Sequence, residues 1–517
     1  MKIERVLVLL SGMLAIGATS AATVSVNTVS GLVDAIAACQ DKAFGEGDVI
    51  EVAAGTYAVD ETIVVDKKSL RIVGAGKGET VFDGGRPAGA ESGSQIFNVT
   101  AEGVNISGIT FRNCGSTGTS GGAIGIGNKC YRFELVDCAF SNCLGKAGGA
   151  VSGSLYYGEH DAQTEGVFPD RGAMGVISGC DFVDCEAAGS DGYDGGGAVS
   201  GAFWIENSTF GRCSSRQFAA AVYTTAHLMV TNCVFTDMSV PEVNPRATVW
   251  QDKSVCEIRV LDSRFERIVS NALVGINNGT VPMLIDRCEI VDCAGEPDSA
   301  DNNKPSIFYQ GKGVIRNSLV RDNRNPFDLG NAGYVNCTFI HNAGGLIIPF
   351  KGGAEGPRPG LTNCLFYANT AFANDNFRTS GGLGICWHGS SMDADVYKNI
   401  SLANCVFCDT VDPSVSADRR RQLLGQDPTG ESARISRLVD DDGPGFVDEA
   451  NGDFNLHKRS VLIDLALRLP GMEDQFDLAG HFRCFRKGQK TPDETSLPDI
   501  GCYEFYTPVR PFIIRLR

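Results

Sequence analysis

Short segments in which apolar and polar residues alternate recur along most of this chain. Each has an apolar residue, usually phenylalanine, with a small residue two places before it and asparagine or cysteine three places after it, as in VDCAFSNC (136–143) and VNCTFIHN (335–342). Residues two apart lie on the same face of a β-strand, so Cys138 and Phe140 should point inward together. Eleven such copies, mostly 19–30 residues apart, predict a repeat protein.

A second short element alternates with the first, as GGAI (121–124), GGAV (148–151 and 196–199), AAAV (219–222) and GGLI (344–347). Each unit therefore contains two or three short strands, and no long segment with helical periodicity interrupts the series. A unit of this size cannot bury its apolar side alone, so successive units must stack. The pattern predicts an all-β chain, a parallel β-helix running over 47–410.

Stacking explains the cysteines, because equivalent residues on neighbouring coils lie ~4.8 Å apart. The position two before the aromatic residue forms an inward column that contains Cys138, Cys180, Cys233, Cys288, Cys337, Cys364 and Cys405. The position three after it reads Cys114, Cys143, Cys185 and Cys213, then Asn323, Asn342 and Asn369, which predicts a turn column with asparagine ladders. A packing column of free thiols is favoured. Some coil-to-coil disulfides remain an alternative, and a zinc site is a weak one.

The two ends of the chain differ from the repeats. Residues 1–22 have a basic start, an apolar run and small residues near Ala22, and so predict a signal peptide and an exported protein. Residues 23–46 are expected to form an N-terminal cap with a helix over 30–40, for which Ser30 is the candidate N-cap. Residues 411–517 are expected to form a polar excursion and a C-terminal cap, in which a Cys484–Cys502 disulfide is left open.

Composition narrows the class of partner. The formal net charge of −17 argues against nucleic acid and against an anionic membrane surface. After signal cleavage no segment approaches the ~20 apolar residues of a transmembrane helix. Glycine is 63 of 517 residues, which indicates many tight turns, and 19 cysteines are compatible with export. The localisation expected is therefore secreted or cell-surface, and the oligomeric state stays open.

The repeats resemble a known family. GGA[IV] alternating with FxxN or FxxC looks like the repeats of polymorphic outer-membrane proteins, and 47–57 with 70–85 is similar to the opening coils of pectate-lyase-like proteins. Segments 444–466, 477–483 and 498–505 resemble the closing region of choice-of-anchor-class secreted proteins. The resemblance implies a single-stranded right-handed parallel β-helix with an N-terminal capping helix and an irregular C-terminal cap. This fold hosts lyases, hydrolases and adhesins alike.

No complete catalytic motif of that superfamily is assembled in the sequence, so the catalytic residues stay unknown. One corner of the coil carries a recurring set of basic groups with a tryptophan at its margin. This candidate binding strip consists of His227, Trp250, Lys253, Lys312, Lys351 and Arg358. Stacked basic groups could follow a linear polyanion, and Trp250 could stack on a sugar ring. An ordinary solvated edge is the alternative for the lysines, and simple packing for Trp250.

These observations favour a secreted or surface protein that binds extracellular, acidic polysaccharide or acts in adhesion. The alternative is a polysaccharide lyase or glycoside hydrolase of the pectate-lyase-like superfamily. No cofactor is implied with certainty. Calcium is considered for two acidic turns, one with Glu186, Asp191 and Asp194, the other with Glu296, Asp298 and Asp301.

Overall fold

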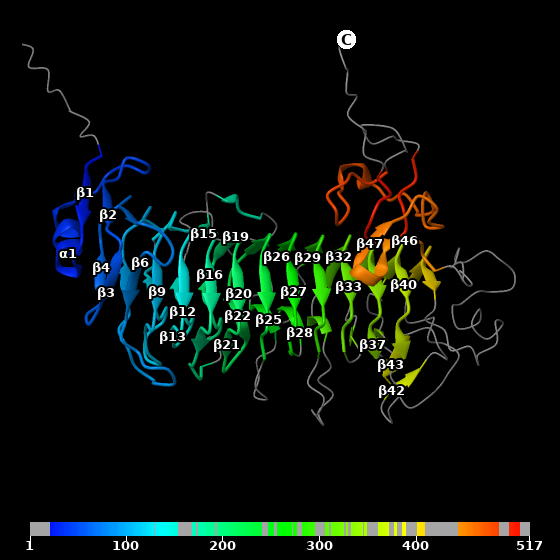
Figure 1. Ribbon diagram of the computed structural model, residues 1–517, viewed down its shortest axis with the longest axis horizontal. Helices are drawn as coiled ribbons and strands as arrows, with labels where there is room; N and C mark the ends of the chain where they lie inside the picture. Colours follow the sequence, from blue (N-terminus) through cyan, green and yellow to red (C-terminus); the bar gives the residue numbers. More distant parts are fainter. Residues whose placement is uncertain are drawn as a thin grey trace, which may run out of the picture.

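The chain winds into one long solenoid (Figure 1). The computed structural model describes residues 21–128, 130–153, 168–171, 174–191, 194–239, 247–252, 256–270, 272–276, 282–294, 306–309, 312–324, 327–328, 332–344, 346–348, 360–371, 377–379, 385–388, 401–408, 443–484 and 496–506. Lys312 and several strands beyond residue 300 are described through their backbone only.

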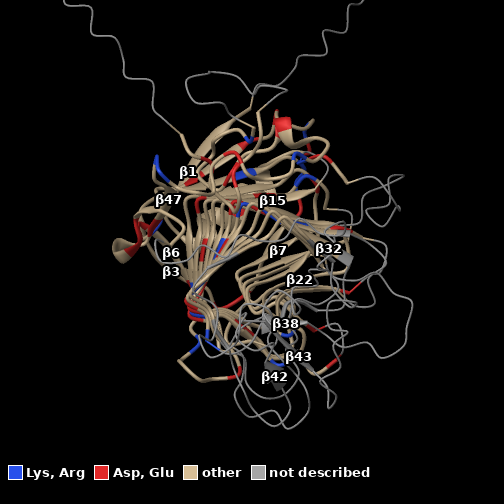
Figure 2. Ribbon diagram, turned by 90° about the vertical axis from the view of Figure 1, so that its right-hand side faces the viewer, with Lys and Arg blue, Asp and Glu red and all other residues tan. Residues whose placement is uncertain are grey.

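Three parallel sheets, named A, B and C, form the walls of the solenoid, and the chain visits them in that order on each coil. Within the described residues, sheet A has 14 strands and sheets B and C have 13 each. The strands of successive coils pair in parallel there, and β42 pairs antiparallel with β43 at the end of sheet C. Seen along the long axis, the coils superimpose (Figure 2). The predicted fold class, a parallel β-helix, is confirmed.

The strands are short and evenly spaced along the chain. Sheet A contains β1 (Thr23–Val26), β2 (Val49–Val52), β5 (Arg71–Gly74), β8 (Asn105–Ser107), β11 (Glu134–Val136), β15 (Gly175–Ser178), β19 (Phe203–Glu206), β23 (Leu228–Thr231), β26 (Ile258–Leu261), β29 (Pro282–Asp286), β32 (Lys312–Arg316), β35 (Gly333–Val335), β39 (Gly360–Thr362) and β44 (Ser401–Ala403). Sheet B contains β3 (Gly55–Ala58), β6 (Thr80–Asp83), β9 (Thr110–Arg112), β12 (Ala139–Ser141), β16 (Asp181–Val183), β20 (Thr209–Gly211), β24 (Val234–Thr236), β27 (Arg264–Glu266), β30 (Glu289–Val291), β33 (Leu319–Arg321), β36 (Thr338–Ile340), β40 (Leu365–Tyr367) and β45 (Val406–Cys408).

Sheet C completes each coil. It contains β4 (Ile63–Val65), β7 (Phe97–Val99), β10 (Ile124–Ile126), β14 (Val151–Gly153), β18 (Val199–Gly201), β22 (Ala219–Thr224), β25 (Ala247–Gln251), β28 (Ala272–Ile276), β31 (Ser306–Tyr309), β34 (Phe327–Asp328), β38 (Leu346–Ile348), β43 (Ile385–His388) and β42 (Phe377–Thr379). Between sheets B and C lie two-residue strands that pair from coil to coil, namely β13 (Leu144–Gly145), β17 (Glu186–Ala187), β21 (Ser214–Ser215), β37 (Ala343–Gly344) and β41 (Thr370–Ala371).

The interior is built from columns of similar residues. Rings in the sheet B column stack face to face, with centroids 4.8 Å apart for Phe140–Phe182 and 4.9 Å for Phe182–Phe210. This spacing equals the distance between neighbouring strands, so in-register pairing stacks the rings without adjustment. Offset aromatic stacking adds to the large apolar area that each ring buries.

The cysteine prediction is confirmed. All seven cysteines of the inward column, Cys138, Cys180, Cys233, Cys288, Cys337, Cys364 and Cys405, are buried and unpaired. Burial raises the pKa of Cys233 to about 12, so this thiol stays protonated and unreactive at neutral pH. Cys484 and Cys502 are also free, so the disulfide left open between them is absent.

The asparagine ladder is confirmed as well. Asn323 donates from Nδ2 to Oδ1 of Asn342 at 2.8 Å, and Asn342 repeats this bond to Asn369 at 2.8 Å. All three side chains are buried. Each amide also donates to a backbone carbonyl of the preceding coil, as Asn342 does to Val320 at 2.9 Å. The ladder therefore satisfies polar groups that would otherwise be costly to bury.

The corners between sheets require left-handed backbone. The residue two places after the inward residue of sheet B has positive φ on coil after coil, for example 54° at Asp184, 49° at Arg212 and 53° at His341. We call this position the BC corner. The residue at the turn from sheet A to sheet B also has positive φ, which is 53° at Asn317, 53° at Asn336 and 54° at Asn363. Asparagine and aspartate tolerate this region better than most residues, which explains their frequency here.

The N-terminal end is closed by α1 (Val29–Ala38), as the sequence indicated, and β1 joins sheet A beside β2. The N-cap is Thr28, whose hydroxyl accepts from the Gly31 amide at 3.0 Å. The expected N-cap, Ser30, was wrong because it lies inside the first turn. Within the described part of the chain, no helix has the length and apolar character needed to cross a membrane.

The C-terminal cap, residues 443–484 and 496–506, folds back over the last coils (Figure 1). It contains the antiparallel hairpin β46 (Phe446–Asp448) and β47 (Asp453–Leu456) and two short 3-10 helices, Glu449–Asn451 and Met472–Asp474. Leu456, Leu462 and Ile500 of the cap pack with Leu365 and Val406 on the outer side of sheet B. The cap thus covers a face that the earlier coils leave open.

Replacing a ladder residue should measure how much the stacked amides stabilise the fold. Asn342→Ala removes the side-chain acceptor of both Asn323 amide groups and the side-chain donor of the Val320 carbonyl, and it leaves Oδ1 of Asn369 with only the backbone amide of residue 342. We expect the free energy of unfolding, measured by urea denaturation, to fall by about 3 kcal/mol. Gln40→Ala, which removes an exposed amide, should change it by less than ~0.5 kcal/mol. Equal effects from the two variants would show that the ladder is not stabilising.

Candidate functional site

An open cleft lies at the seam between the solenoid and the C-terminal cap. Its volume is about 550 Å³, and it is lined by Arg321, Asp322 and His341 of the solenoid and by Glu449, Ala450, Gly452 and Phe454 of the hairpin. Polar groups of both charges therefore meet an aromatic ring in one concave surface. Ligand sites combine these features: a concave wall with a few convergent polar groups.

Two cleft residues occupy the BC corner on successive coils. Asp322 follows the inward Val320, and His341 follows the inward Phe339, each by two places. Both have positive φ, 57° and 53°, and their side chains point outward from the solenoid into the cleft. Because β33 pairs in register with β36, Oδ1 of Asp322 comes within 3.6 Å of Nδ1 of His341.

His341 stands between two carboxylates. Its Nε2 lies 3.0 Å from Oε1 of Glu449, and its Nδ1 faces Asp322. The ring also packs near Tyr367, with centroids 5.7 Å apart, and edge-on to Phe454 at 6.4 Å. The side chains of Asp322, His341 and Glu449 are 40%, 35% and 35% exposed, so all three can reach a molecule in the cleft.

Arg321 closes one side of this group. Its Nη1 donates to Oδ2 of Asp322 at 2.6 Å, and its guanidinium carbon lies 5.7 Å from the centroid of Phe454. Asp322 is therefore shared between a guanidinium and an imidazole. Charged hydrogen bonds of this kind fix side-chain geometry better than neutral ones.

The cap positions Glu449 at the tip of its hairpin. The chain turns there through the 3-10 helix Glu449–Asn451 and Gly452, whose φ of 78° suits glycine. Asn451 donates to the Asp448 carboxylate at 2.7 Å, which tightens the turn. Phe446 and Phe454 pack edge to face at 5.3 Å and hold the hairpin against the solenoid.

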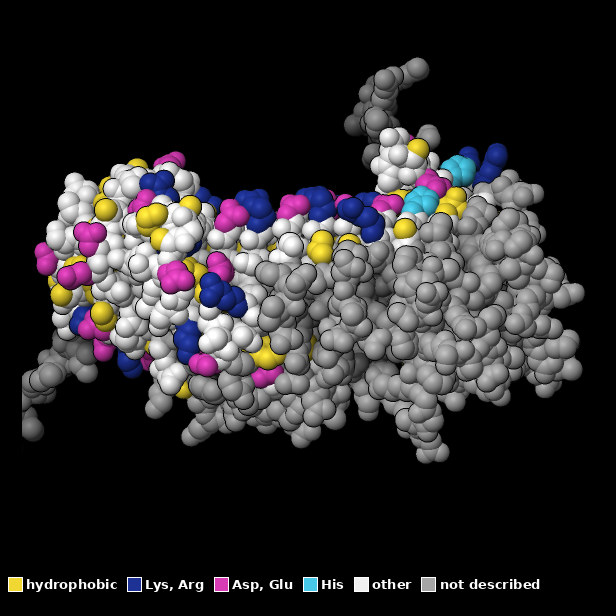
Figure 3. Space-filling model, turned by 90° about the horizontal axis from the view of Figure 1, so that it is seen from below, with side chains coloured by type: hydrophobic (Ala, Val, Ile, Leu, Met, Phe, Trp, Pro, Cys, Tyr) yellow, Lys and Arg dark blue, Asp and Glu magenta, His cyan; other side chains and the backbone are white. Residues whose placement is uncertain are grey.

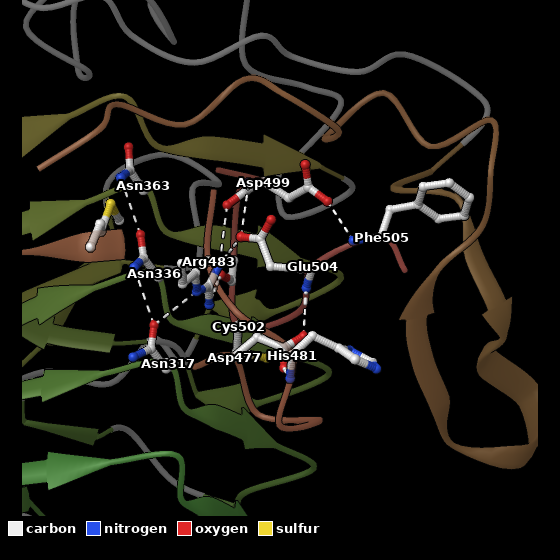
Figure 4. A network of polar contacts seen from close by, with 12 residues as sticks. Asn317, Asn336, Asn363, Asp477, His481, Arg483, Asp499, Cys502, Glu504 and Phe505 are labelled. Carbon is white, nitrogen blue, oxygen red and sulfur yellow. Dashed lines mark hydrogen bonds and ion pairs between the residues drawn. The ribbon is translucent and has the colours of Figure 1, made fainter. Parts of the chain in front are cut away.

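The cap is itself fastened by a buried polar network (Figure 4). Arg483, fully buried, donates from Nε to Asn317 at 3.1 Å and from Nη1 to Glu504 at 2.8 Å. Asn317 belongs to a second asparagine ladder, at the corner between sheets A and B. Asn363 of that ladder donates to the carbonyl oxygen of Leu467 in the cap and accepts from its backbone amide. The ladder thus provides the surface on which the cap docks.

Three buried carboxylates belong to this network, of which Glu504 forms the ion pair with Arg483, while Asp477 and Asp499 accept from backbone amides. Asp477, Asp499 and Glu504 are each at most slightly exposed. Burial raises the pKa of Glu504 to about 8, although Arg483 counteracts part of the effect, and burial raises the pKa of Asp499 to about 6. All four residues lie in 477–483 and 498–505, two of the segments on which the sequence resemblance rested. Those motifs therefore fasten the cap.

The binding strip predicted from the sequence is only partly described by the structure. Lys253, Lys351 and Arg358 lie outside the described residues, and Lys312 is described by its backbone alone. Strand register aligns Lys312 with Pro282, and Pro282 lies in the column of Glu257 and His227. His227 and Lys312 therefore lie in one column at the corner between sheets C and A, separated by Glu257 and Pro282, and the basic strip itself stays a prediction.

Two members of that strip are buried, contrary to expectation. His227 is 2% exposed, accepts from the Glu257 amide at Nδ1 (3.0 Å) and packs edge-on to Phe168. Trp250 is 0% exposed and stacks on Phe218 with ring centroids 5.7 Å apart. The prediction that Trp250 presents its ring to a sugar is wrong, because neighbouring aromatic residues cover that ring.

The acidic turn considered for calcium is neutralised by basic side chains. Lys146 lies 3.0 Å from Asp191 and 3.7 Å from Asp194, and Arg216 lies 3.5 Å from Glu186. Across the described residues, no group of three or more histidine, cysteine or acidic side chains is placed to hold a metal ion. Glu296, Asp298 and Asp301 lie outside the described residues.

Comparisons with known proteins find likeness in solved structures alone. No protein-family model and no curated protein matches the chain. The PL6 family alginate lyase AlyGC is similar over 77% of this chain and 52% of its own, with 10% identity and a TM-score of 0.39. The catalytic domain of a GH87 α-1,3-glucanase in complex with nigerose is similar over 67% of this chain and 64% of its own, with 11% identity and a TM-score of 0.39. Pectate lyase Pel9A is similar over 95% of this chain and 98% of its own, with 12% identity and a TM-score of 0.33. The chain spans about half the length of AlyGC.

The sequence did not identify the cleft residues, although it held part of the signal. VRDN (320–323) and FIHN (339–342) are equivalent repeat segments, so Asp322 and His341 could have been placed side by side. Glu449 lies 108 residues beyond His341, in the cap, where the repeat has ended. No periodicity connects it to the corner.

The buried carboxylates make cap docking depend on pH. Both folded pKa values lie above the ordinary values of 3.8 and 4.5, so the folded cap binds more protons than the unfolded cap. Stability from this network is therefore fully present below about pH 4 and is lost as pH rises through 6 and then 8. We expect the thermal midpoint to fall from pH 5 to pH 9.

Glu504→Gln should flatten this dependence, because glutamine keeps the hydrogen-bonding shape and cannot ionise. Glu473→Gln, which changes a cap carboxylate that is 46% exposed, is the matched control and should leave the slope intact. Thermal melting of the three proteins across this range is the measurement. A midpoint that rises with pH in the wild type would contradict the assignment.

Proposed function

We propose that this protein binds an extracellular polysaccharide in the cleft between the solenoid and its C-terminal cap. The observation that carries the proposal is the composition of the cleft, which sets Arg321, His341, Asp322 and Glu449 around the edge of Phe454. A sugar ring has hydroxyl groups that both donate and accept hydrogen bonds, and it has apolar C–H faces. Donors, acceptors and an aromatic wall in one open cleft complement all three.

The volume and the openness of the site fit a polymer. About 550 Å³ is within the ~300–1,000 Å³ typical of ligand sites, and it holds a few sugar units. The cleft is open and lies on the outside of the coils, at the corner where β33 and β36 end, so a polymer can approach it from solvent. Export, which the N-terminal sequence predicts, would place the protein where such polymers occur.

Substitutions in the cleft should weaken binding. Arg321→Gln and His341→Gln each remove a hydrogen-bond donor that also carries or can carry charge, and we expect about a tenfold loss of affinity from each, about 1.4 kcal/mol. Affinity electrophoresis against soluble neutral and uronate-rich polysaccharides selects the polymer, and calorimetry measures the constants. Arg212→Gln is the matched control, because Arg212 occupies the same corner position and is ion-paired to Asp184 at 2.7 Å outside the cleft. Equal loss in all three variants, or no binding by the wild type, would refute the cleft as the site.

Binding of an acidic polymer along the corner between sheets C and A is a second candidate. It is supported by the strand register, in which Lys312 starts β32 at that corner. Positive side chains along this corner would attract a polyanion. Salt would weaken the contact, because exposed charges more than ~8 Å apart are screened at physiological ionic strength.

Replacement of Lys253, Lys312 and Lys351 together by serine tests this second surface. The triple variant should lose affinity for uronate-rich polymers at low salt and differ little from the wild type at high salt. Lys67→Ser with Lys68→Ser is the control, because these lysines occupy the same corner at the N-terminal end of the solenoid. Identical binding by the triple variant and the wild type at low salt would leave the corner as a solvated edge.

A further inference from the structure

We propose that the cleft selects polysaccharides whose sugars carry free amino groups, with the carboxylates of Glu449 and Asp322 as the partners of the sugar ammonium group. This inference rests on the proposed function and deepens it, because it names the ligand class for the same site. It starts from the hydrogen bonds of the residues that line the cleft. The acceptors are partly open, whereas the nitrogen donors are engaged by those same carboxylates.

Two carboxylate oxygens of the cleft lack a hydrogen bond within the described part of the chain. Oε1 of Glu449 is 3.0 Å from Nε2 of His341, but Oε2 has no partner among the described residues. Oδ2 of Asp322 accepts from Arg321, whereas Oδ1 lies 3.6 Å from Nδ1 of His341, which is too long for a hydrogen bond. Both acidic side chains are partly exposed, so these oxygens can accept hydrogen bonds from a ligand.

The nitrogen donors of the cleft are less available to a ligand. The side chain of Arg321 is only 20% exposed, and its Nη1 donates to Asp322 at 2.6 Å. Both ring nitrogens of His341 face carboxylates. Arg321 and His341 therefore hold Asp322 and Glu449 in place, because charged hydrogen bonds fix side-chain geometry. This role agrees with the weaker binding expected of the Arg321→Gln and His341→Gln variants.

The charge of the cleft walls also favours a cation. The hairpin wall, residues 446–456, contains Asp448, Glu449 and Asp453 but no lysine or arginine. On the solenoid wall, the one arginine and the one aspartate cancel. The basic residues that follow the hairpin, 458–459, do not line the cleft. A positive group is therefore attracted to this site, and a uronate is repelled.

The neighbouring coils of the same corner balance their charges. Next to the cleft, the BC corner carries ion pairs, Arg267 with Asp237 at 2.6 Å and Arg324 with Asp292 at 2.7 Å. Figure 3 shows acidic and basic side chains alternating along one edge toward the cap. Because opposite charges alternate there, a cation is expected to bind at the cleft rather than along the corner.

A sugar amine suits the open acceptors better than a hydroxyl or an acetamide group does. As an ammonium group it carries a positive charge and donates up to three hydrogen bonds, as a lysine side chain does. Hydrogen bonds between a cation and a carboxylate are roughly twice as strong as neutral ones. A hydroxyl group donates only once, and an acetamide group has no charge. Sugars that differ in this one substituent therefore distinguish selection of the amine from general sugar binding.

The test uses the full chain and three hexamers, of β-1,4-linked glucosamine, N-acetylglucosamine and glucose, which differ only in the substituent on carbon 2. A hexagalacturonate is the acidic reference. Calorimetry at pH 6, where the sugar amine is charged, measures the dissociation constants at low and at high salt. We expect the glucosamine hexamer to bind about tenfold more tightly than the glucose hexamer. Salt should reduce this difference, because it screens exposed charges.

Two variants with the same change in net charge locate the preference. Glu449→Gln should abolish it, because glutamine keeps the shape of the side chain but not its charge, and should leave the affinity for the glucose hexamer unchanged. Asp292→Asn removes a carboxylate one coil before Asp322 on the same corner, outside the cleft, and should retain the preference.

The outcomes separate this inference from the proposed function. Equal binding of all the hexamers by the wild type, or tightest binding of any hexamer other than that of glucosamine, would overturn selection of the amine and leave the proposed function standing. The same conclusion follows if Glu449→Gln keeps the preference or if Asp292→Asn loses it. Binding of no saccharide, whether amino, neutral or acidic, would refute the proposed function as well.

Discussion

Each coil of this protein must lie directly on the one before it, at the spacing of one β-strand. In-register parallel pairing imposes that constraint, and the main features of the described solenoid follow from it. Rings, thiols and amides recur at equal positions because a residue that fits its own coil must also fit the identical surface above and below it. The same constraint aligns the corners, so that Asp322 and His341 become neighbours although they are far apart along the chain.

The inward columns could be predicted from the sequence because they depend only on each repeat being stacked directly on the one before it. Once Cys138 and Cys180 occupy equal places in the repeat, their burial and their proximity follow. The ladder of Asn323, Asn342 and Asn369 was predictable for the same reason. The exposure of side chains at the corners depends instead on which loop residues pack over them. Phe168 arrives from another coil to cover His227, and Phe218 covers Trp250, so both residues predicted to bind a ligand are buried.

The cleft lay beyond sequence reasoning for a related reason. Half of it comes from the cap, which has no repeat and reaches the corner only after docking on the ladder that begins at Asn317. The motifs that resembled a closing region contain Arg483, its ion-pair partner Glu504 and two further buried carboxylates, and this network fixes the cap in place. The integrity of the cleft therefore depends on a buried network at the side of the coils, and fold stability and ligand binding should change together when that network is altered.

Hydrogen–deuterium exchange with and without a saturating oligosaccharide tests the central claim most directly, because it locates the ligand without substituting a residue. Binding in the cleft predicts slower exchange in two segments that are distant in sequence, 319–342 of the solenoid and 446–456 of the hairpin. Both should be protected together, since the cleft exists only where they meet. Protection confined to the corner between sheets C and A, with these two segments unchanged, would contradict the account.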